Sequence, residues 1–160
     1  MQNIDLICVG KLKEKFYLAA CAEYQKRLGA YCKLELTELS EERLPQNPSR
    51  AQIDAALERE AAAIRGKIPP NSCLVALCVE GKPHSSEELA RLVRTWQDSA
   101  ARHLVFVIGG SFGLAESLKK EAKVRLSMSP MTFPHHLARV MLLEQIYRAF
   151  KIREGSSYHK

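Results

Sequence analysis

The sequence lacks the features of membrane, secreted and metal-binding proteins. No apolar run approaches the roughly 20 residues that span a bilayer, so no transmembrane segment is expected. Residues 1–10 have no basic region ahead of their apolar stretch and no small-residue cleavage site, and they predict a strand rather than a signal peptide. The five cysteines form no CxxC pair and no zinc spacing with the five histidines. We therefore expect free thiols in a reducing cytoplasm and no metal.

The common nucleotide-binding motifs are absent as well. The glycine turn at 109–113 (GGSFG) is not G-x-G-x-x-G, and no Lys-Ser/Thr follows it, which excludes a P-loop. Glycines in such a turn still permit close approach to a ligand, or they simply serve the geometry of the turn. The same residues also spell G-x-S-x-G, the nucleophile elbow of serine hydrolases, with Ser111 as nucleophile and Glu144 and His159 following in hydrolase order. The short chain and the lack of an HGG-type oxyanion segment weigh against that alternative.

Composition and charge indicate one globular domain with a basic side. The 160 residues are 46% hydrophobic and 26% charged, as expected for a single domain over 1–160. The net charge of +6 is unevenly spread, because residues 114–160 hold 9 Lys/Arg and 4 Asp/Glu, a net of +5. A one-sided basic region favours a polyanionic partner such as RNA, although a solvated surface would look the same.

Apolar periodicity predicts strands and helices in alternation. The expected strands are 3–10, 33–39, 74–79, 104–108 and 124–127, and the expected helices are 13–28, 49–66, 85–101, 114–122 and 134–152. Capping boxes at Ser49 and Ser85 mark two of the helix starts. This order predicts an α/β fold with a mostly parallel sheet and helices on both faces. The alternating strand at 33–39 is expected near a sheet edge.

Three segments follow the carboxyl ends of the later strands, where ligands bind in such sheets. They are Glu80-Gly81, the glycine turn at 109–113 and the stretch 127–134 (SMSPMTFP). The last is uncharged and stiffened by two prolines, so it is suited to sandwich an adenine ring and present main-chain groups to its edge. The alternative is a rigid connection that only packs against the core.

The final helix and the residues after it carry the remaining signals. The helix is apolar around most of its girth, which favours burial against a second copy in a homodimer. Glu144 and Arg148 are spaced for an intrahelical ion pair. The segment 156–160 (SSYHK) combines an aromatic ring, an imidazole and a cation, which suits base stacking and proton transfer, although a frayed segment is the alternative.

Four motifs together resemble one family. They are I-G-G-x-x-G at 108–113, L-S-x-S-x-M-T-x-P-H at 126–135, E-Q-x-Y-R-A at 144–149 and Y-H-K at 158–160. Over essentially the whole chain the sequence resembles the RlmH family, the ribosomal large-subunit pseudouridine N3-methyltransferases of the SPOUT class. It departs from the usual pattern at His136, where many relatives have glutamine, and just before the tyrosine of Y-H-K, where a proline is common.

The resemblance implies a fold, a cofactor and a substrate. The fold would be a SPOUT-type α/β knot, with a C-terminal trefoil knot, in a cytoplasmic homodimer. The cofactor would be S-adenosylmethionine, and the substrate a pseudouridine in helix 69 of 23S rRNA. Motif matching places the cofactor contacts on Leu77, Gly109, Met128, Ser129, Pro130, Met131, Thr132 and Phe133.

On the substrate side, each polar residue has an expected role. His159 is the expected proton acceptor, Tyr158 the stacking platform, and Glu144 the residue that orients an arginine. The groups expected to hold RNA or the developing imide anion are Arg139, Arg148, His135 and Lys160. A non-catalytic module that binds ribosomal RNA is the second alternative function.

Overall fold

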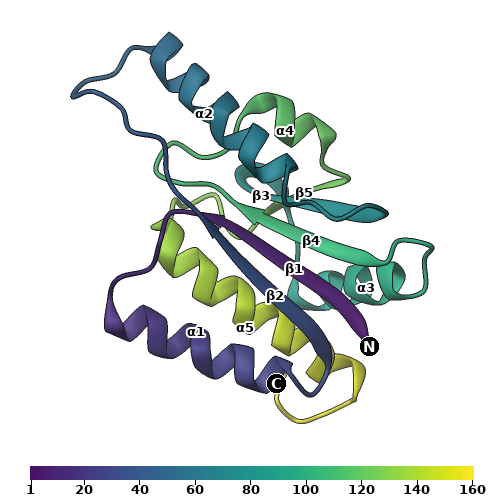
Figure 1. Ribbon diagram of the computed structural model, residues 1–160. Helices are drawn as coiled ribbons and strands as arrows, with labels where there is room; N and C mark the ends of the chain where they lie inside the picture. Colours follow the sequence, from purple (N-terminus) through teal and green to yellow (C-terminus); the bar gives the residue numbers. More distant parts are fainter.

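Strands and helices alternate along the whole chain, as the sequence predicts. The computed structural model describes residues 1–160. Its elements are β1 (Gln2–Val9), α1 (Lys15–Leu28), β2 (Cys32–Leu39), α2 (Arg50–Arg65), β3 (Ser72–Pro83), α3 (Ser86–Gln97), β4 (His103–Ile108), α4 (Glu116–Glu121), β5 (Val124–Ser127) and α5 (His135–Arg153) (Figure 1). Both capping boxes are present at the starts of α2 and α3. No helix is long and apolar enough to cross a bilayer.

The five strands form one parallel sheet. Its strand order is β2-β1-β4-β3-β5, and every neighbouring pair is parallel. The half-exposed strand β2 lies at one edge, which confirms its predicted place. Because all strands point the same way, the segments that follow β3, β4 and β5 emerge at the same side of the sheet.

Helices cover both faces of the sheet, as predicted (Figure 1). On one face, Leu6 and Phe106 of the sheet pack in a buried cluster with Leu142 of α5 and residues of α1 and α3. On the other face, Val107 packs in a second cluster with Leu118 of α4 and residues of α2. Successive strand residues point to opposite faces, so the continuously apolar strands supply both clusters.

Strand β3 differs from its expected length. It runs to Pro83 rather than ending at residue 79, and both Leu77 and Lys82 register with Leu126 of β5. Residues 78–81 therefore bulge out of the ladder. A Cβ at Gly81 would lie 2.8 Å from the carbonyl carbon of Arg125, so the backbones of β3 and β5 lie in close contact there. The trefoil knot stays a prediction.

Helix α1 buries most of the stripe that i, i+4 spacing predicts, which comprises Phe16, Ala20, Tyr24 and Leu28, but not its first residue. Phe16 is 67% exposed, whereas Cys21 and Leu28 are buried and Tyr17 and Tyr24 pack against them. The reason is geometric. A strict four-residue spacing drifts around a helix with 3.6 residues per turn, whereas alternating spacings of four and three stay on one face. Helix α3 differs from its prediction in length, because it ends at Gln97 and not at residue 101.

Arg139 lies inside the protein rather than at an RNA-binding surface. It is only 2% exposed, and its Nη1 donates to Glu38 Oε2 at 2.6 Å. Its Nη2 donates to the carbonyl oxygen of Gly10 at 3.0 Å. The guanidinium therefore joins the start of α5 to the ends of β1 and β2. We assign it a structural role in place of the expected contact with RNA.

Loss of the Glu38 charge is expected to destabilise the fold. Burial raises the pKa of Glu38, but hydrogen bonds from Arg139 and from the Leu12 amide outweigh it and hold that pKa below its usual value. Glu38→Gln should therefore lower the free energy of unfolding at pH 7 by about 2 kcal/mol, because Arg139 stays buried without its counter-charge. Urea denaturation measures this, with the exposed Glu35→Gln on the same strand as control.

The destabilisation depends on pH in a defined direction. A carboxyl whose folded pKa is lowered stabilises the protein above its unfolded pKa, and this contribution is lost as the pH falls through the folded value. The difference between wild type and Glu38→Gln should therefore be constant near neutral pH and shrink below about pH 4.5. A difference that grows in acid would contradict this assignment of the ion pair.

Candidate active site

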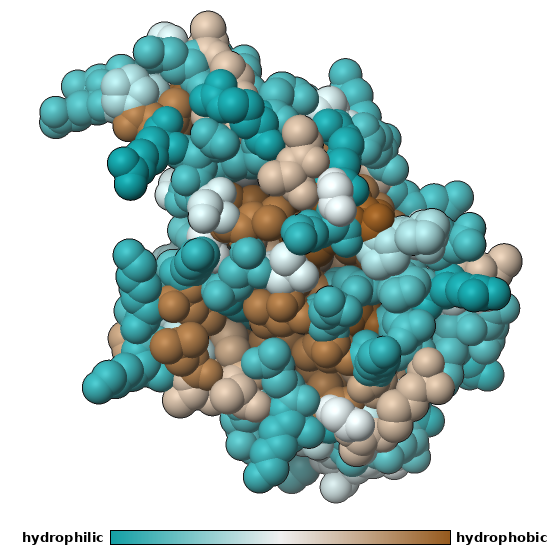
Figure 2. Space-filling model, viewed as in Figure 1, coloured by the Kyte–Doolittle hydropathy of each residue, from teal (hydrophilic) through white to brown (hydrophobic).

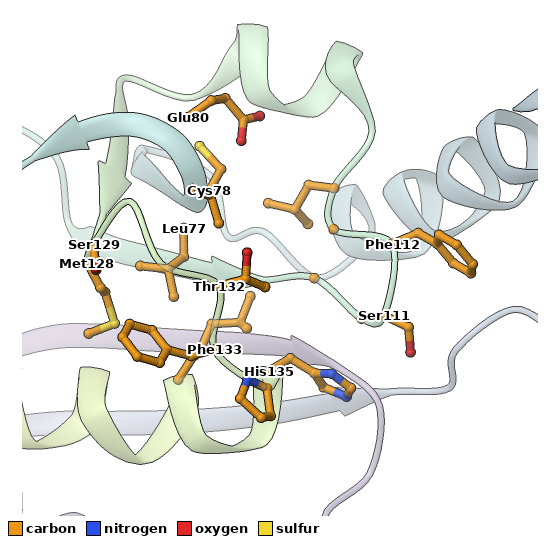
Figure 3. Close-up of a pocket in the computed structure, with 18 of the residues that line it drawn as sticks. Leu77, Cys78, Glu80, Ser111, Phe112, Met128, Ser129, Thr132, Phe133 and His135 are labelled. Atoms are coloured by element: carbon orange, nitrogen blue, oxygen red, sulfur yellow. The ribbon is translucent and has the colours of Figure 1, made fainter.

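A cavity of about 760 Å³ opens at the bulge of β3 and at the ends of β4 and β5 (Figure 3). One wall is the β3 bulge with Leu77, Cys78 and Glu80, and the floor is the glycine turn 109–113. The third wall is the uncharged segment that runs from Met128 into α5. The crevice that the strand order predicts is therefore present, and all three expected segments contribute to it.

The expected cofactor contacts gather around this cavity, with one exception. The lining includes Leu77, Gly109, Met128, Ser129, Met131, Thr132 and Phe133. Pro130 lies outside the lining. His135, expected on the RNA side, also lines the cavity, and Figure 3 shows it beside Phe133 and Thr132.

The glycine turn is so tight that two of its residues, Gly109 and Gly113, have no room or no suitable backbone conformation for a side chain. A Cβ at Gly109 would lie 2.5 Å from the carbonyl carbon of Gly113, closer than real Cβ contacts come. Gly113 has φ +82° and donates its amide to the Gly110 carbonyl at 3.1 Å. Gly109 and Gly113 line the cavity without side chains, so a ligand can approach the backbone of the turn closely there.

The uncharged segment is held by its own hydroxyl groups. Ser127 Oγ lies 2.9 Å from the carbonyl of Val79 and 3.1 Å from that of Ser129. Ser129 Oγ accepts the amide of Met131 at 3.0 Å. These bonds tie the segment to the β3 bulge, so its wall of the cavity is ordered before any ligand arrives.

Charge on the cavity wall is confined to one ion-paired group. Lys119 is ion-paired with both Glu80 and Glu116. The hydrogen bond from Lys119 holds the pKa of Glu80 below its usual value. Burial, together with neighbouring His136, lowers the pKa of His135, so its imidazole is neutral at pH 7. No local pattern marks Lys119 in advance, because its partner Glu80 lies 39 positions away in the sequence.

A second polar group lies farther along α5. Arg148 Nη2 donates to Glu144 Oε1 at 2.6 Å, which is the predicted intrahelical pair. The Tyr158 hydroxyl donates to the same oxygen at 3.1 Å, and the Arg148 guanidinium lies 4.8 Å from the centre of the Tyr158 ring. The segment that contains Tyr158 is therefore packed onto its own helix and is not frayed.

His159 is held on both sides of its ring. Arg148 Nη1 lies 3.2 Å from Nδ1, and Glu87 Oε1 lies 2.7 Å from Nε2. Arginine only donates, so we assign a neutral imidazole with its proton on Nε2 and its lone pair on Nδ1. Glu87 was missed by sequence analysis, because an acid in the first turn of a helix is expected from the helix dipole alone. Lys160 is exposed.

The cavity and the His159 group lie apart within one chain. Ala138 lines the cavity, and Arg148 follows it ten residues later on the same helix, which corresponds to about 15 Å along the axis. A groove of about 460 Å³ lies between them, with Met128 at the cavity side and Glu144 at the other. The side chains with expected roles on the substrate side are therefore remote from the cavity of their own chain.

The serine-hydrolase alternative is not supported by this arrangement. The Ser111 amide donates to Glu41 Oε1 at 2.7 Å, and no hydrogen bond joins the Ser111 hydroxyl to a histidine. Glu144 and His159 are instead both bound to Arg148. The catalytic triad that the G-x-S-x-G pattern would require is not assembled.

Comparison with known proteins identifies the family. Residues 2–159 match the family described as "Predicted SPOUT methyltransferase". A protein of Clostridioides difficile (strain 630) called "Ribosomal RNA large subunit methyltransferase H" is 47% identical over 161 residues, covering 99% of both chains. One of the same name from Clostridium botulinum (strain Okra / Type B1) is 48% identical over 158 residues, again with 99% of both chains covered.

Solved structures of lower identity share the fold. A probable methyltransferase from Bordetella pertussis Tohama I aligns with a TM-score of 0.59 at 18% identity, over 92% of this chain and 94% of that one. A probable methylase family protein from Haemophilus influenzae Rd KW20 aligns with a TM-score of 0.56 at 14% identity, over 99% of this chain and 71% of that one. With its parallel sheet, its cavity and these relatives, the chain belongs to the SPOUT methyltransferases and, among them, to the RlmH family.

Proposed function

We propose that the protein transfers a methyl group from S-adenosylmethionine to N3 of a pseudouridine in helix 69 of 23S rRNA, in the cytoplasm. The observation that carries this proposal is the meeting of the glycine turn and the uncharged segment 128–134 around one cavity. The names of the relatives, which span the full chain, support ribosomal RNA as the substrate.

The residues of the cavity fit the proposed cofactor. Its volume of about 760 Å³ lies in the range of ligand pockets, and Leu77, Met128 and Phe133 offer apolar surface to a ring. The ion pair of Lys119 with Glu80 offers one charge of each sign to the amino-acid end of the cofactor. When bound, the cofactor would supply an electrophilic methyl group on a positively charged sulfur.

The protein's own residues would position the acceptor base and take its proton. N3 of a uracil-type ring carries an imide proton, and the lone pair on His159 Nδ1 is suited to accept it once Arg148 turns from that nitrogen to the developing imide anion. Glu87 holds the opposite nitrogen and stabilises the imidazolium that forms. Burial and Glu144 raise the pKa of Tyr158, which keeps it a neutral phenol beside the base. Lys160 is free to bind phosphate.

We further propose a homodimer in which each site is shared. Leu137, Val140 and Met141 are only half-buried on α5. Figure 2 shows hydrophobic residues gathered around the middle of the face on which α1, α5 and β2 lie in Figure 1. A two-fold axis across α5 would place the His159 end of one helix beside the cavity end of the other. This removes the separation of about 15 Å that exists within one chain.

Mixing two inactive variants tests the shared site. An Arg148→Ala subunit and a Gly109→Ala subunit should each be inactive as homodimers. After the subunits are mixed and allowed to exchange, about a quarter of the wild-type activity should return. Half of the randomly formed dimers are heterodimers, and each heterodimer has one intact site and one doubly defective site. Ribosome methylation is the readout. No return of activity in confirmed heterodimers would place each site within one subunit.

Calorimetry and mass mapping separate the remaining alternatives. Titration with S-adenosylmethionine should release or absorb heat, whereas a module that only binds RNA should give none. Mass mapping of rRNA from cells without the protein should show the loss of one methyl group on a helix 69 pseudouridine. A serine hydrolase would instead be labelled at Ser111 by a fluorophosphonate.

A further inference from the structure

We propose that Glu41 is a positioning residue that holds the glycine turn of the cavity in its ligand-ready shape. The inference rests on the proposed function for the identity of the ligand, S-adenosylmethionine. Glu41 follows β2 and lies outside every motif, and its bond to the turn spans 70 positions of sequence. It touches the turn that forms the cavity floor rather than the cavity itself.

Two contacts place the Glu41 carboxylate against the turn. Its Oε1 accepts the backbone amide of Ser111 at 2.7 Å. A Cβ built at Gly110 would lie 2.6 Å from that oxygen and 2.8 Å from the carboxyl carbon. The carboxylate therefore lies directly on Gly110 while it binds the next residue. Gly110 and Ser111 both line the cavity, so their placement determines the shape of its floor.

The segment that carries Glu41 is itself anchored. The amide of Glu42 donates to Glu60 Oε2 of α2 at 2.8 Å, and the Glu42 carboxylate pairs with Arg59 at 3.3 Å. The anchored backbone at residue 42 fixes the position from which the Glu41 side chain extends. Helix α2 thus supports the floor of a cavity that it does not line.

The contacts also explain the two adjacent glycines of the motif. Gly109 is excluded from carrying a side chain by the backbone of Gly113, at the other end of the same turn. At Gly110 the three atoms nearest to an added Cβ all belong to the Glu41 side chain, so a side chain there would displace the carboxylate. Gly109 allows the turn to close on itself, and Gly110 leaves room for the Glu41 carboxylate that holds the turn.

Binding measurements on single variants test this role. S-adenosylmethionine should bind Glu41→Ala about ten-fold more weakly than wild type, the effect of losing one charge-assisted hydrogen bond. Glu41→Gln should bind close to wild type, because its amide oxygen still accepts the Ser111 amide. Glu35→Ala is the matched control, because this exposed carboxylate on β2 takes no part in the anchor, and it should bind as wild type does. In methylation assays, KM for the methyl donor should rise in Glu41→Ala while kcat stays constant.

A double-mutant cycle tests the contact with Gly110 directly. Gly110→Ala alone should weaken binding, whereas adding it to Glu41→Ala should cost nothing further, because the side chain that it would meet is gone. Additive losses would overturn the inference. So would wild-type binding by Glu41→Ala, or an equal loss in Glu35→Ala. Absence of binding by the wild-type protein would instead contradict the proposed function, so the two failures are distinct.

Discussion

Replacement of His159 by alanine is expected to lower the turnover of ribosome methylation by roughly 10²–10⁴-fold, the range for removal of a general base. The affinity for S-adenosylmethionine should not change, since His159 does not line the cavity. The physical reason is the lone pair on Nδ1, which His159 presents while Glu87 holds its other nitrogen at 2.7 Å. Single-turnover methylation measures the turnover, and calorimetry measures the affinity for S-adenosylmethionine.

Chemical rescue distinguishes a proton acceptor from a structural side chain. Free imidazole added to His159→Ala should restore part of the turnover, because it can occupy the vacated space and accept the N3 proton. His159→Asn keeps a polar side chain without an imidazole and should stay slow. Full turnover in His159→Ala would show that another base, such as water, takes the proton. A slow variant that imidazole does not rescue would leave His159 only a role in holding Arg148.

Gly109→Ala should weaken cofactor binding by about 100-fold and abolish methylation at ordinary donor concentrations. Its Cβ would lie 2.5 Å from the carbonyl carbon of Gly113, so the turn must open and the cavity floor must move. Overpacking of this kind costs about 1–3 kcal/mol, and the upper end corresponds to this loss. Calorimetric titration with S-adenosylmethionine measures it.

Gly66→Ala provides the matched control for that substitution. The same methyl group at Gly66 would meet its nearest atom at 3.5 Å, an ordinary contact, and the residue already has helical backbone angles. Both variants should fold, and only Gly109→Ala should lose the cofactor. Wild-type affinity in Gly109→Ala would mean that the turn does not contact the cofactor.

The fold and the cavity follow from local patterns in the sequence. Continuously apolar runs predict the buried parallel strands, and capping boxes at Ser49 and Ser85 mark helix starts that the structure confirms. The position of the cavity also follows, because it depends only on where parallel strands end. Each of these inferences uses residues that are close together in sequence.

The pairings that complete the site do not follow from local patterns. Glu41 meets the glycine turn across 70 positions, and Glu87 meets His159 across 72. Arg139 was expected at the surface because it is a basic residue at the start of a helix. Its burial depends on Glu38, which lies 101 positions away. Such contacts depend on how the elements pack, and a single sequence does not encode that packing in any short motif.

One cysteine on the cavity wall offers a natural site for chemical labelling. Cys78 is the thiol on the cavity wall, whereas Cys8, Cys21, Cys32 and Cys73 are buried in the core. Burial raises the pKa of Cys78, so at neutral pH the reactive thiolate is a minor form and alkylation is slow. Because the other four thiols are buried, a thiol-reactive fluorophore or spin label should attach to Cys78 first and can report on occupancy of the cavity.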